Sequence, residues 1–387
     1  MTSRTETFSR SVVRVRSLFR TRRGLRLAAL ALVALAWAAV SATAATTKTS
    51  VTWPTATQEI AKSGISTDIA FCGTKPITLA VLDGFGINAW SQESFAAVRS
   101  EAAKCKNVKQ IVLAGGGDLQ KMISDVSSAV AQGAKAIVIN PDFGEAELAA
   151  IKQATAAGVK VVAVYSDPGG APGVDYLSVV KWNNSHAGTI WAQWMVKALK
   201  GHGNVVFTGG PAGSAVGIGQ LAAIVKVFAR YPGMHLLTGT KSWPVTNWDP
   251  ATAQKATAAL LAKYPKIDGI ISNYGTDALA SARAFQNAGR KLVPVTTLDA
   301  NALSCLYKKA GVAMSTRSSG NWLGRVAARK AIAAAVGLPN KEPSDYNIPF
   351  FEDTLAGKPL QCNTKAPDDF YPSNQLSLAT IAKYGKP

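Results

Sequence analysis

Residues 119–165, LQKMISDVSSAVAQGAKAIVINPDFGEAELAAIKQATAAGVKVVAVY, alternate between two hydrophobic patterns. Two segments with apolar side chains at helical spacing end close to a glycine, Gly133 and Gly158. Glycine is a common helix stop because it adopts the left-handed backbone conformation without strain. Residues 136–140 and 159–165 are instead short continuous apolar runs, which are typical of strands covered on both faces. This order predicts a parallel sheet flanked by helices.

The same alternation runs along most of the chain. The expected strands are residues 77–82, 110–114, 136–140, 159–165, 176–180, 204–208, 235–238, 269–272, 293–298 and 313–316. The expected helices between them include residues 95–104, 119–131, 145–157, 187–200, 253–264 and 278–288. Ten strands exceed one comfortable sheet. We therefore expect an α/β protein of two lobes, each built on a doubly wound parallel sheet.

The composition excludes several classes of protein. Of the 387 residues, 48% are hydrophobic and 17% are charged, which excludes disorder, collagen and coiled coil. The net charge is +19, but residues 1–44 alone hold eight arginines and one acid, Glu6. The remaining basic residues are scattered, with no run longer than Lys308-Lys309. Nucleic-acid sites concentrate positive charge on one face, so we expect no nucleic-acid partner.

The N-terminus has the pattern of an export signal. A basic leader precedes an apolar stretch at residues 27–40 and an Ala-x-Ala site at Ala42–Ala44. At 1.5 Å per residue this stretch is about 21 Å long as a helix, short of a ~30 Å bilayer core. We expect a signal peptide over residues 1–44, cleaved near Ala44, a periplasmic mature protein, and an N-terminal extension over residues 45–74. An uncleaved anchor is the alternative, and Arg22-Arg23 leaves the twin-arginine route open.

Export also favours disulfides among the four cysteines. Three pairings exist, and we expect Cys72–Cys105 and Cys305–Cys362, because the members of each pair lie in the same third of the chain. Four buried thiols are the alternative. A zinc site is not expected, because there is no CxxC and the three histidines are far apart.

Polar and aromatic residues gather after the expected strands, where open parallel sheets bind their ligands. The residues singled out there are Asp83, Asn88, Trp90, Asn140, Asp167, Trp182, Trp248, Asn273, Tyr274 and Asp299. Carboxylates and carboxamides hold hydroxyls, and aromatic faces pack on sugar C–H faces. The pattern therefore favours a neutral polyhydroxylated ligand in a shared cleft. The alternative for each Asp or Asn is a helix cap or a turn.

Several segments occur in a familiar order: QGAKAI at 132–137, INPD at 139–142, AAGVKVV at 156–162, NWD at 247–249 and the stretch 277–289. In order and spacing, the chain from Lys75 to Leu338 resembles the type 1 periplasmic binding proteins of sugar transporters, particularly the ribose-binding cluster. The resemblance implies two α/β lobes, three crossings between them and a ligand in the cleft. It also implies delivery to a membrane permease driven by an ATPase subunit, with no cofactor, and we expect a monomer. The expected N-terminal lobe is 75–181 plus 318–344, the C-terminal lobe is 182–317 plus 345–387, and the crossings lie near 181–184, 315–319 and 344–348.

The resemblance also implies roles for single residues. Asn88 and Trp90 match a hydroxyl-binding Asn and a stacking aromatic, Asp167 and Asp299 match two carboxylates, Trp248 matches the second stacking ring, and Asn273 matches the cleft amide. The sequence departs from the ribose pattern at Pro168 and Gly217, where that pattern has arginines, and Arg317 stands beside the position of its hinge glutamine. Arginine forks grip the ring oxygen and hydroxyls. We therefore expect a ligand other than ribose in the usual pose, with Asp83, Trp182, Asn184 and Tyr274 as candidate substitutes.

Other functions remain as alternatives. An enzyme is not expected, because there is no Gly-x-Ser-x-Gly elbow and no histidine beside an obvious nucleophile. The glycine-rich GGPAGS at 209–214 lacks the Lys-Ser/Thr of a phosphate loop. A transcriptional repressor with the same core would need a helix-turn-helix where this chain has its leader. The same fold binding a nucleoside or a signalling furanose, or serving a chemoreceptor, stays open.

Overall fold

The computed structural model describes residues 69–86 and 88–387 of the chain. The predicted signal peptide and residues 45–68 of the predicted extension lie outside the described residues. Of the rest of that extension, Ala70–Cys72 form a short 3-10 turn, η1. Within the described ranges, no helix combines the length and apolar character needed to cross a bilayer.

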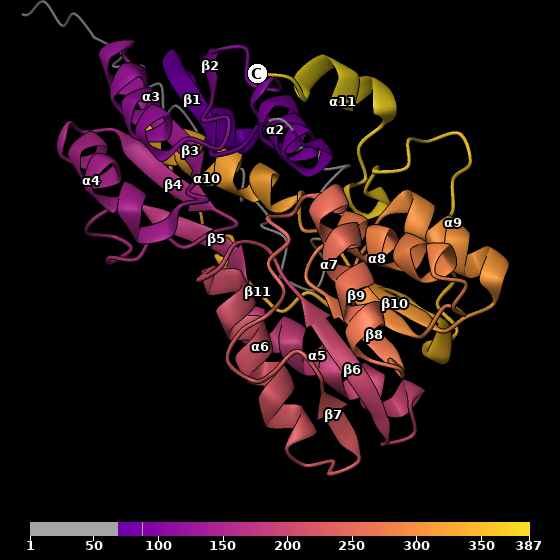
Figure 1. Cartoon of the computed structure of the whole chain (residues 1–387). Helices are drawn as coiled ribbons and strands as arrows, with labels where there is room; N and C mark the ends of the chain where they lie inside the picture. Colours follow the sequence, from indigo (N-terminus) through magenta and orange to yellow (C-terminus); the bar gives the residue numbers. More distant parts are fainter. Residues whose placement is uncertain (1–68, 87) are drawn as a thin grey trace, which may run out of the picture. The chain divides into compact units, whose positions relative to one another are not determined.

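The N-terminal lobe is built on a parallel sheet of strand order β11-β5-β4-β3-β1-β2 (Figure 1). Its strands are β1 (Ile77–Asp83), β2 (Val108–Ala114), β3 (Ala136–Asn140), β4 (Lys160–Val164), β5 (Ser178–Trp182) and β11 (Asp345–Tyr346). Its helices are α2 (Ala89–Ala102), α3 (Leu119–Ala131), α4 (Leu148–Ala156) and α10 (Leu323–Val336). Leu79 and Val81 pack in one core with α2 and α10, whereas Ala80 and Leu82 pack in another with α3 and α4. Helices therefore cover both faces of the sheet, which is why its central strands β1 and β3 are largely buried and apolar.

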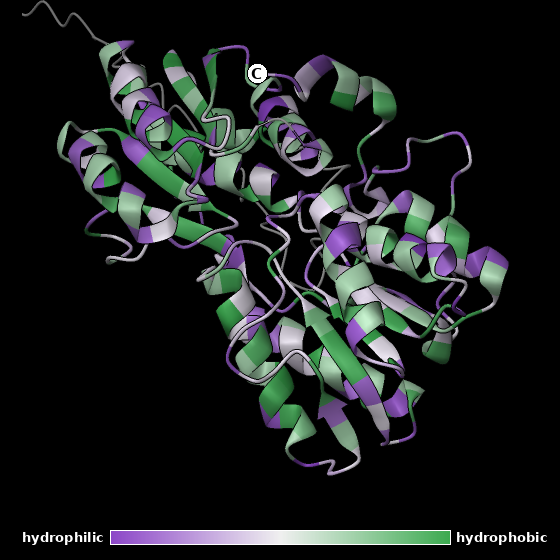
Figure 2. Cartoon of the chain, viewed as in Figure 1, coloured by the Kyte–Doolittle hydropathy of each residue, from purple (hydrophilic) through white to green (hydrophobic). Residues whose placement is uncertain are grey.

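The C-terminal lobe repeats this plan in the order β12-β10-β9-β8-β6-β7, with β12 antiparallel to β10. Its strands are β6 (Gly203–Thr208), β7 (Met234–Leu236), β8 (Gly269–Ser272), β9 (Val295–Leu298), β10 (Met314–Arg317) and β12 (Phe350–Asp353). Its helices are α5 (Asn184–Ala198), α6 (Ala215–Phe228), α7 (Pro250–Lys263), α8 (Gly275–Asn287) and α9 (Asn301–Ala310). Figure 2 shows strands of both sheets largely in hydrophobic colours, while the helices alternate between hydrophobic and hydrophilic residues.

The two-sheet α/β prediction is confirmed, and all ten expected strands are present within a few residues of their expected ends. Gly133 and Gly158 have φ values of 83° and 86°, as expected for helix stops. Helix α2 begins at Ala89 rather than near residue 95, because the Asn88 side chain caps it by accepting from the Ser91 N–H. The expected helix at 145–157 is a 3-10 turn, η2 (Gly144–Glu147), followed by α4.

Two strands were missed by the sequence analysis. Strand β11 has only two residues, and β12 is an edge strand ending in two acids, so neither forms a continuous apolar run. Strand β11 pairs with β5, so Asp345 and Tyr346 belong to the N-terminal sheet. The chain passes between the lobes after β5, after β10 and between β11 and β12, close to the three expected crossings.

Both predicted disulfides are present. The Cys72–Cys105 disulfide joins η1 to the turn after α2, and its two cysteines are 33 residues apart in the sequence. Cys305–Cys362 joins α9 to the segment after β12 across a separation of 57. Each pair restricts the unfolded chain, and longer loops restrict it more.

Removing either bridge is expected to destabilise the protein. Serine at both positions of the 33-residue loop (Cys72→Ser with Cys105→Ser) should lower the free energy of unfolding by about 3–4 kcal/mol. The matched comparison is the double variant Cys305→Ser with Cys362→Ser. Because this disulfide closes a longer loop, its removal should lower the free energy of unfolding by at least as much. Urea unfolding at constant pH measures both. A loss below about 1 kcal/mol for either pair would contradict the loop-entropy account.

Candidate ligand-binding cavity

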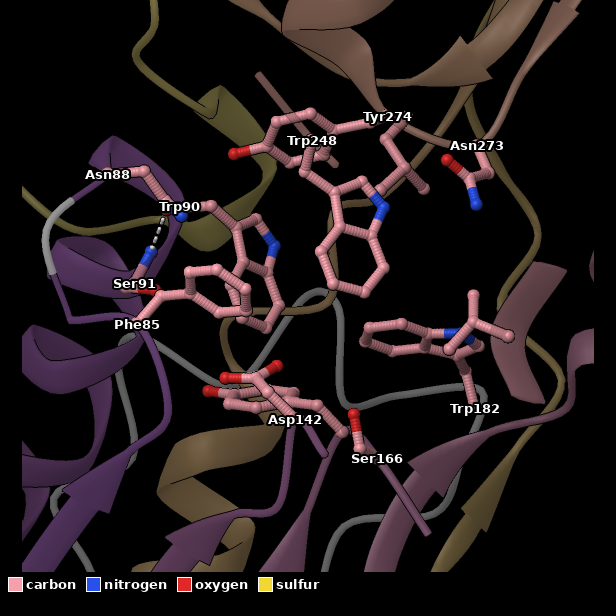
Figure 3. Close-up of a pocket in the computed structure, with 13 residues that line it drawn as sticks. Phe85, Asn88, Trp90, Ser91, Asp142, Ser166, Trp182, Trp248, Asn273 and Tyr274 are labelled. Carbon is pink, nitrogen blue, oxygen red and sulfur yellow. Dashed lines mark hydrogen bonds between the residues drawn. The ribbon is translucent and has the colours of Figure 1, made fainter. Parts of the chain in front are cut away.

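A cavity lies at the carboxyl ends of the strands and is lined from both lobes (Figure 3). Its lining residues are Phe85, Asn88, Trp90, Ser91, Asp142, Tyr165, Ser166, Trp182, Val216, Trp248, Asn273, Tyr274 and Leu298. Six of these side chains are aromatic, which suits a ligand with apolar faces.

Three of the rings form an edge-to-face cluster on the N-terminal side. Trp90 lies 4.7 Å from Tyr165 and 6.4 Å from Trp182, measured between ring centroids, at interplanar angles of 69° and 90°. The polar atoms of all three rings are bound outside the cavity: Trp90 Nε1 donates to the Ser319 carbonyl, Tyr165 Oη to the Asn321 carbonyl and Trp182 Nε1 to Asn184 Oδ1. The rings are thereby fixed by the hinge segments, and all three contribute to the lining of the cavity.

Trp248 brings a ring from the C-terminal lobe to the same cavity. It lies 6.2 Å from Phe85 at 80°, and Figure 3 shows its indole pointing into the cavity. Asn247 and Trp248 have φ values of 52° and 54°, and Tyr165 has 67°. Such conformations cost non-glycine residues about 1–2 kcal/mol each and gather at ligand sites.

The glycine-rich segment after β6 makes room for indole rings. A Cβ on Gly210 would come within 2.2 Å of the Trp248 ring, and Cβ atoms on Gly209 and Gly217 would come within 2.8 and 2.6 Å of Trp243. Trp243 Nε1 donates to the Gly210 carbonyl at 3.1 Å. The physical reason for glycine here is therefore the close approach of tryptophan side chains.

Polar atoms without a protein partner point to ligand contacts. Neither amide atom of the buried Asn273 has a hydrogen-bond partner within the protein, although buried amides usually have one. Asp142 accepts from Asn140 Nδ2 through Oδ1 at 3.0 Å, while its Oδ2 has no partner. Figure 3 shows the Asp142 carboxyl and the Asn273 amide on opposite sides of the cavity. Burial raises the pKa of Asp142 well above its usual value, and Asp83 and Glu147 nearby raise it further.

Six of the predicted site residues line the cavity: Asn88, Trp90, Trp182, Trp248, Asn273 and Tyr274. Asn88 also caps α2, so the capping alternative holds for it too. Asp249, the neighbour of Trp248, caps α7 by accepting from the Thr252 N–H. Asn273 caps no helix, because the residue at the start of α8 is Tyr274.

Five predicted site residues are not among the lining residues. Asp83 is buried below the loop that follows β1, where it accepts from the N–H groups of Phe85 and Gly86, and Asn140 Nδ2 lies 3.1 Å from its carboxylate. Asn140 thus links Asp83 to Asp142. Asp167 is 38% exposed and forms an ion pair with Lys181. These three positions support the cavity wall or lie beside it.

The other two lie at the hinge. The buried Asp299 carboxylate accepts from Ser319 N–H at 2.6 Å and from the N–H and hydroxyl of Ser373 at 2.9 and 2.8 Å. The guanidinium of Arg317 is buried between Trp182 and Trp191, 4.9 and 5.8 Å from their ring centroids, and has no hydrogen-bond partner in the protein. Burial lowers the pKa of Arg317 to about 9, an effect that Asp299 opposes.

Seven of the lining residues were not singled out by the sequence analysis: Phe85, Ser91, Asp142, Tyr165, Ser166, Val216 and Leu298. Most of them follow a strand directly, so their place at strand ends was the available signal. Nothing in the sequence indicated that Tyr165, Val216 and Leu298 line a cavity, because residues of their type in apolar segments are typical of the hydrophobic core. Among the described residues, no group of three or more His, Cys, Asp or Glu is placed to hold a metal ion.

Comparison with known proteins places the fold in a family. Residues 80–339 match the model described as "Periplasmic binding protein domain". The chain belongs to this family. A xylitol-binding protein of Mycolicibacterium smegmatis is 26% identical over 219 residues, covering 55% of this chain and 61% of that protein. A D-apiose import binding protein of Paraburkholderia graminis is 28% identical over 198 residues, covering 51% and 61%. The chain thus spans about three-fifths of the length of these relatives.

Solved structures share the two-lobed fold. The arabinose-transporter binding protein of Shewanella sp. ANA-3, bound to L-arabinofuranose, superposes with a TM-score of 0.62 at 20% identity, covering 69% of this chain and 88% of that one. A solute-binding protein of Bacillus halodurans with bound myo-inositol has a TM-score of 0.63 at 16% identity, covering 72% and 94%. These likenesses confirm the type 1 periplasmic binding protein fold.

A buried acid behind Trp248 makes the stability depend on pH. Thr246 has one hydroxyl proton but lies 2.7 Å from the Gly209 carbonyl and 2.5 Å from Asp277 Oδ2. Both contacts are hydrogen bonds if Thr246 donates to the carbonyl and a protonated Asp277 donates to Thr246. Burial raises the pKa of Asp277 from 3.8 to about 7, in keeping with this arrangement.

Asp277→Asn should therefore remove part of the pH dependence. Between pH 4 and 7 the native carboxyl keeps a proton that the unfolded chain has lost, so its contribution to stability is full at low pH and falls as pH rises. From pH 5 to 7, wild type should lose about 1–2 kcal/mol more unfolding free energy than the variant, measured with urea. Asp118→Asn, at an exposed residue that caps α3 in the N-terminal lobe, is the control and should parallel wild type, because asparagine caps a helix as well as aspartate does. If wild type and Asp277→Asn lost the same unfolding free energy from pH 5 to 7, this account would be contradicted.

Proposed function

We propose that this chain captures a neutral sugar or polyol between its lobes and delivers it to a membrane permease driven by an ATPase subunit. The observation that carries the proposal is the cavity itself, in which aromatic faces from both lobes surround an amide and a carboxyl with unpartnered atoms. Such rings pack on the C–H faces of a sugar, while the amide and carboxyl bind its hydroxyls.

The geometry supports a ligand of low charge and several hydroxyls. Asn273 offers one donor group and one acceptor, and a hydroxyl satisfies either. Asp142 Oδ2 accepts from a hydroxyl, and its raised pKa reduces the charge that a neutral ligand must face. Arg317 packs against the Trp182 ring and is not among the lining residues, so its guanidinium does not form part of the cavity surface. We propose the lining residues, with Asp83, Asn140 and Asp299 as their support, as the ligand-binding machinery.

The mechanism is hinge closure without a chemical step. Each lobe supplies part of the contacts: Trp90 and Asp142 from one, Trp248 and Asn273 from the other. A ligand that touches both lobes stabilises the closed arrangement over the open one, because only the closed state makes all contacts. Binding therefore requires no catalytic group, and we propose no enzymatic activity.

The similar proteins support this class of ligand, since the names of four of them state a sugar or polyol: xylitol, D-apiose, L-arabinofuranose and myo-inositol. The leader at residues 1–44 supports export to the periplasm. We further propose that the protein binds no nucleic acid, because the positive charge outside the leader is scattered. We also propose that it acts as a monomer. A nucleoside ligand, or delivery to a chemoreceptor, is the alternative within the same fold.

A thermal-unfolding screen of the mature chain from Ala45 tests the ligand class. The panel is xylitol, D-apiose, L-arabinose, myo-inositol and uridine, each at 1 mM. A ligand present at about 1,000 times its dissociation constant adds about 4 kcal/mol to the folded state and raises the midpoint by several degrees. We expect such a shift with a sugar or polyol. A shift with uridine alone would overturn the ligand class, and no shift with any compound would contradict the function.

Asn273→Ala tests the site. It should raise the dissociation constant of the ligand found in the screen by about 10- to 100-fold, because it leaves a ligand hydroxyl unpaired in a dry cavity. Calorimetric titration measures this change. Asn287→Ala is the matched control, since Asn287 is an exposed asparagine at the far end of α8, the helix that begins two residues after Asn273. Wild-type affinity in Asn273→Ala would show that the cavity is not where the ligand binds.

A further inference from the structure

The segment at residues 361–377, here called the strap, leads from β12 to a final helix, α11 (Leu378–Tyr384). Its first part is fixed to the C-terminal lobe by the Cys305–Cys362 disulfide and by Asn301. Asn301 Nδ2 lies 2.8–3.2 Å from three strap carbonyls, and its own N–H donates to the Phe370 carbonyl at 2.8 Å. The sequence analysis placed the whole tail on this lobe.

The next residue of the strap binds the other lobe. Tyr371 N–H donates to Glu93 Oε1 in α2 at 3.0 Å, and Asn374 Nδ2 donates to Glu93 Oε2. The Asn374 carbonyl accepts from Arg325 Nη2 in α10 at 2.7 Å. Helix α11 then packs on α2, where Arg99 donates to the Tyr384 carbonyl at 2.8 Å (Figure 1).

Between these two anchors, the strap is bonded to the hinge. Ser373 contacts Asp299 of the C-terminal lobe and accepts from the Ser318 hydroxyl at 2.8 Å, within the crossing after β10. Tyr371, Ser373 and Asn374 are fully buried. A second cavity lies between the strap and the ligand site, and it shares Asn88, Trp248 and Tyr274 with that site. The strap therefore forms the wall on one flank of the cleft.

We propose that the strap is a fourth connection between the lobes that limits how far they open. Phe370 bonds to one lobe and Tyr371, its neighbour, bonds to the other. Adjacent residues are only about 3.8 Å apart, so the chain has no slack here. Separating the lobes at this flank breaks buried hydrogen bonds on one side, and the unpaired groups carry a desolvation cost. The inference depends on the two-lobed structure and holds whatever ligand the cavity takes.

Glu93→Ala tests this, because it removes two of the three hydrogen bonds described above between the strap and the N-terminal lobe and leaves the anchors on the C-terminal lobe intact. Spin labels on cysteines at two exposed positions, Gln132 and Lys263, report the distance between the lobes in the ligand-free mature chain. We expect one narrow distance distribution for wild type and an additional population at longer distance for Glu93→Ala. Lys152→Ala is the control: it removes the ion pair from an exposed lysine to Asp175 within the N-terminal lobe, which does not involve the strap, and should leave the distribution unchanged.

Asn374→Ala provides a milder variant should Glu93→Ala fail to fold, since it keeps the Tyr371 bond. It should shift the distribution in the same direction by a smaller amount. Distributions identical to wild type in the folded variants would overturn the proposal. If neither variant folds, hydrogen exchange of the wild type decides: protection of the Tyr371 and Ser373 amides equal to that of the core strands supports the strap, and exchange as fast as a surface loop overturns it.

Discussion

The common direction of the strands is the constraint on which the binding site depends. Because both sheets are parallel apart from β12, their carboxyl ends gather at one edge of each lobe. The loops at those edges carry eight of the thirteen lining residues, the other five end a strand or lie in the first turn of a helix, and the crossings hold the two edges next to one cavity. Side chains as distant in sequence as Phe85 and Trp248 therefore meet.

The cavity is prepared for a ligand by interactions outside it. The ring nitrogens of Trp90 and Trp182 and the hydroxyl of Tyr165 are satisfied by hinge residues, so the rings keep fixed orientations. Left-handed backbone at Asn247 and Trp248 places the opposing indole at an energetic cost. Rigid rings lose little conformational freedom on binding, which leaves more of the contact energy for affinity.

The sequence was sufficient for the architecture but only for part of the site. Continuous apolar runs predicted the strands because both faces of each sheet are covered, and this signal was absent for the short β11 and the edge strand β12. Residue type at a strand end predicted Trp90, Trp248 and Asn273 correctly as lining residues. It did not separate them from Asp83 or Asp299, whose carboxylates are occupied by protein groups. The partner of Asp299 is Ser373, and local sequence pattern carries no information on contacts that a tail makes 74 residues away.

The central claim is that a polyhydroxylated ligand binds between the rings of the two lobes. A crystal structure of the mature chain with the compound that gives the largest thermal shift tests it most directly. The account predicts the ligand's C–H face against Trp248 or the Trp90–Trp182 pair, with hydroxyls bonded to Asn273 and Asp142. A ligand bound elsewhere, or one in this cavity that leaves both Asn273 and Asp142 without a contact, would contradict it.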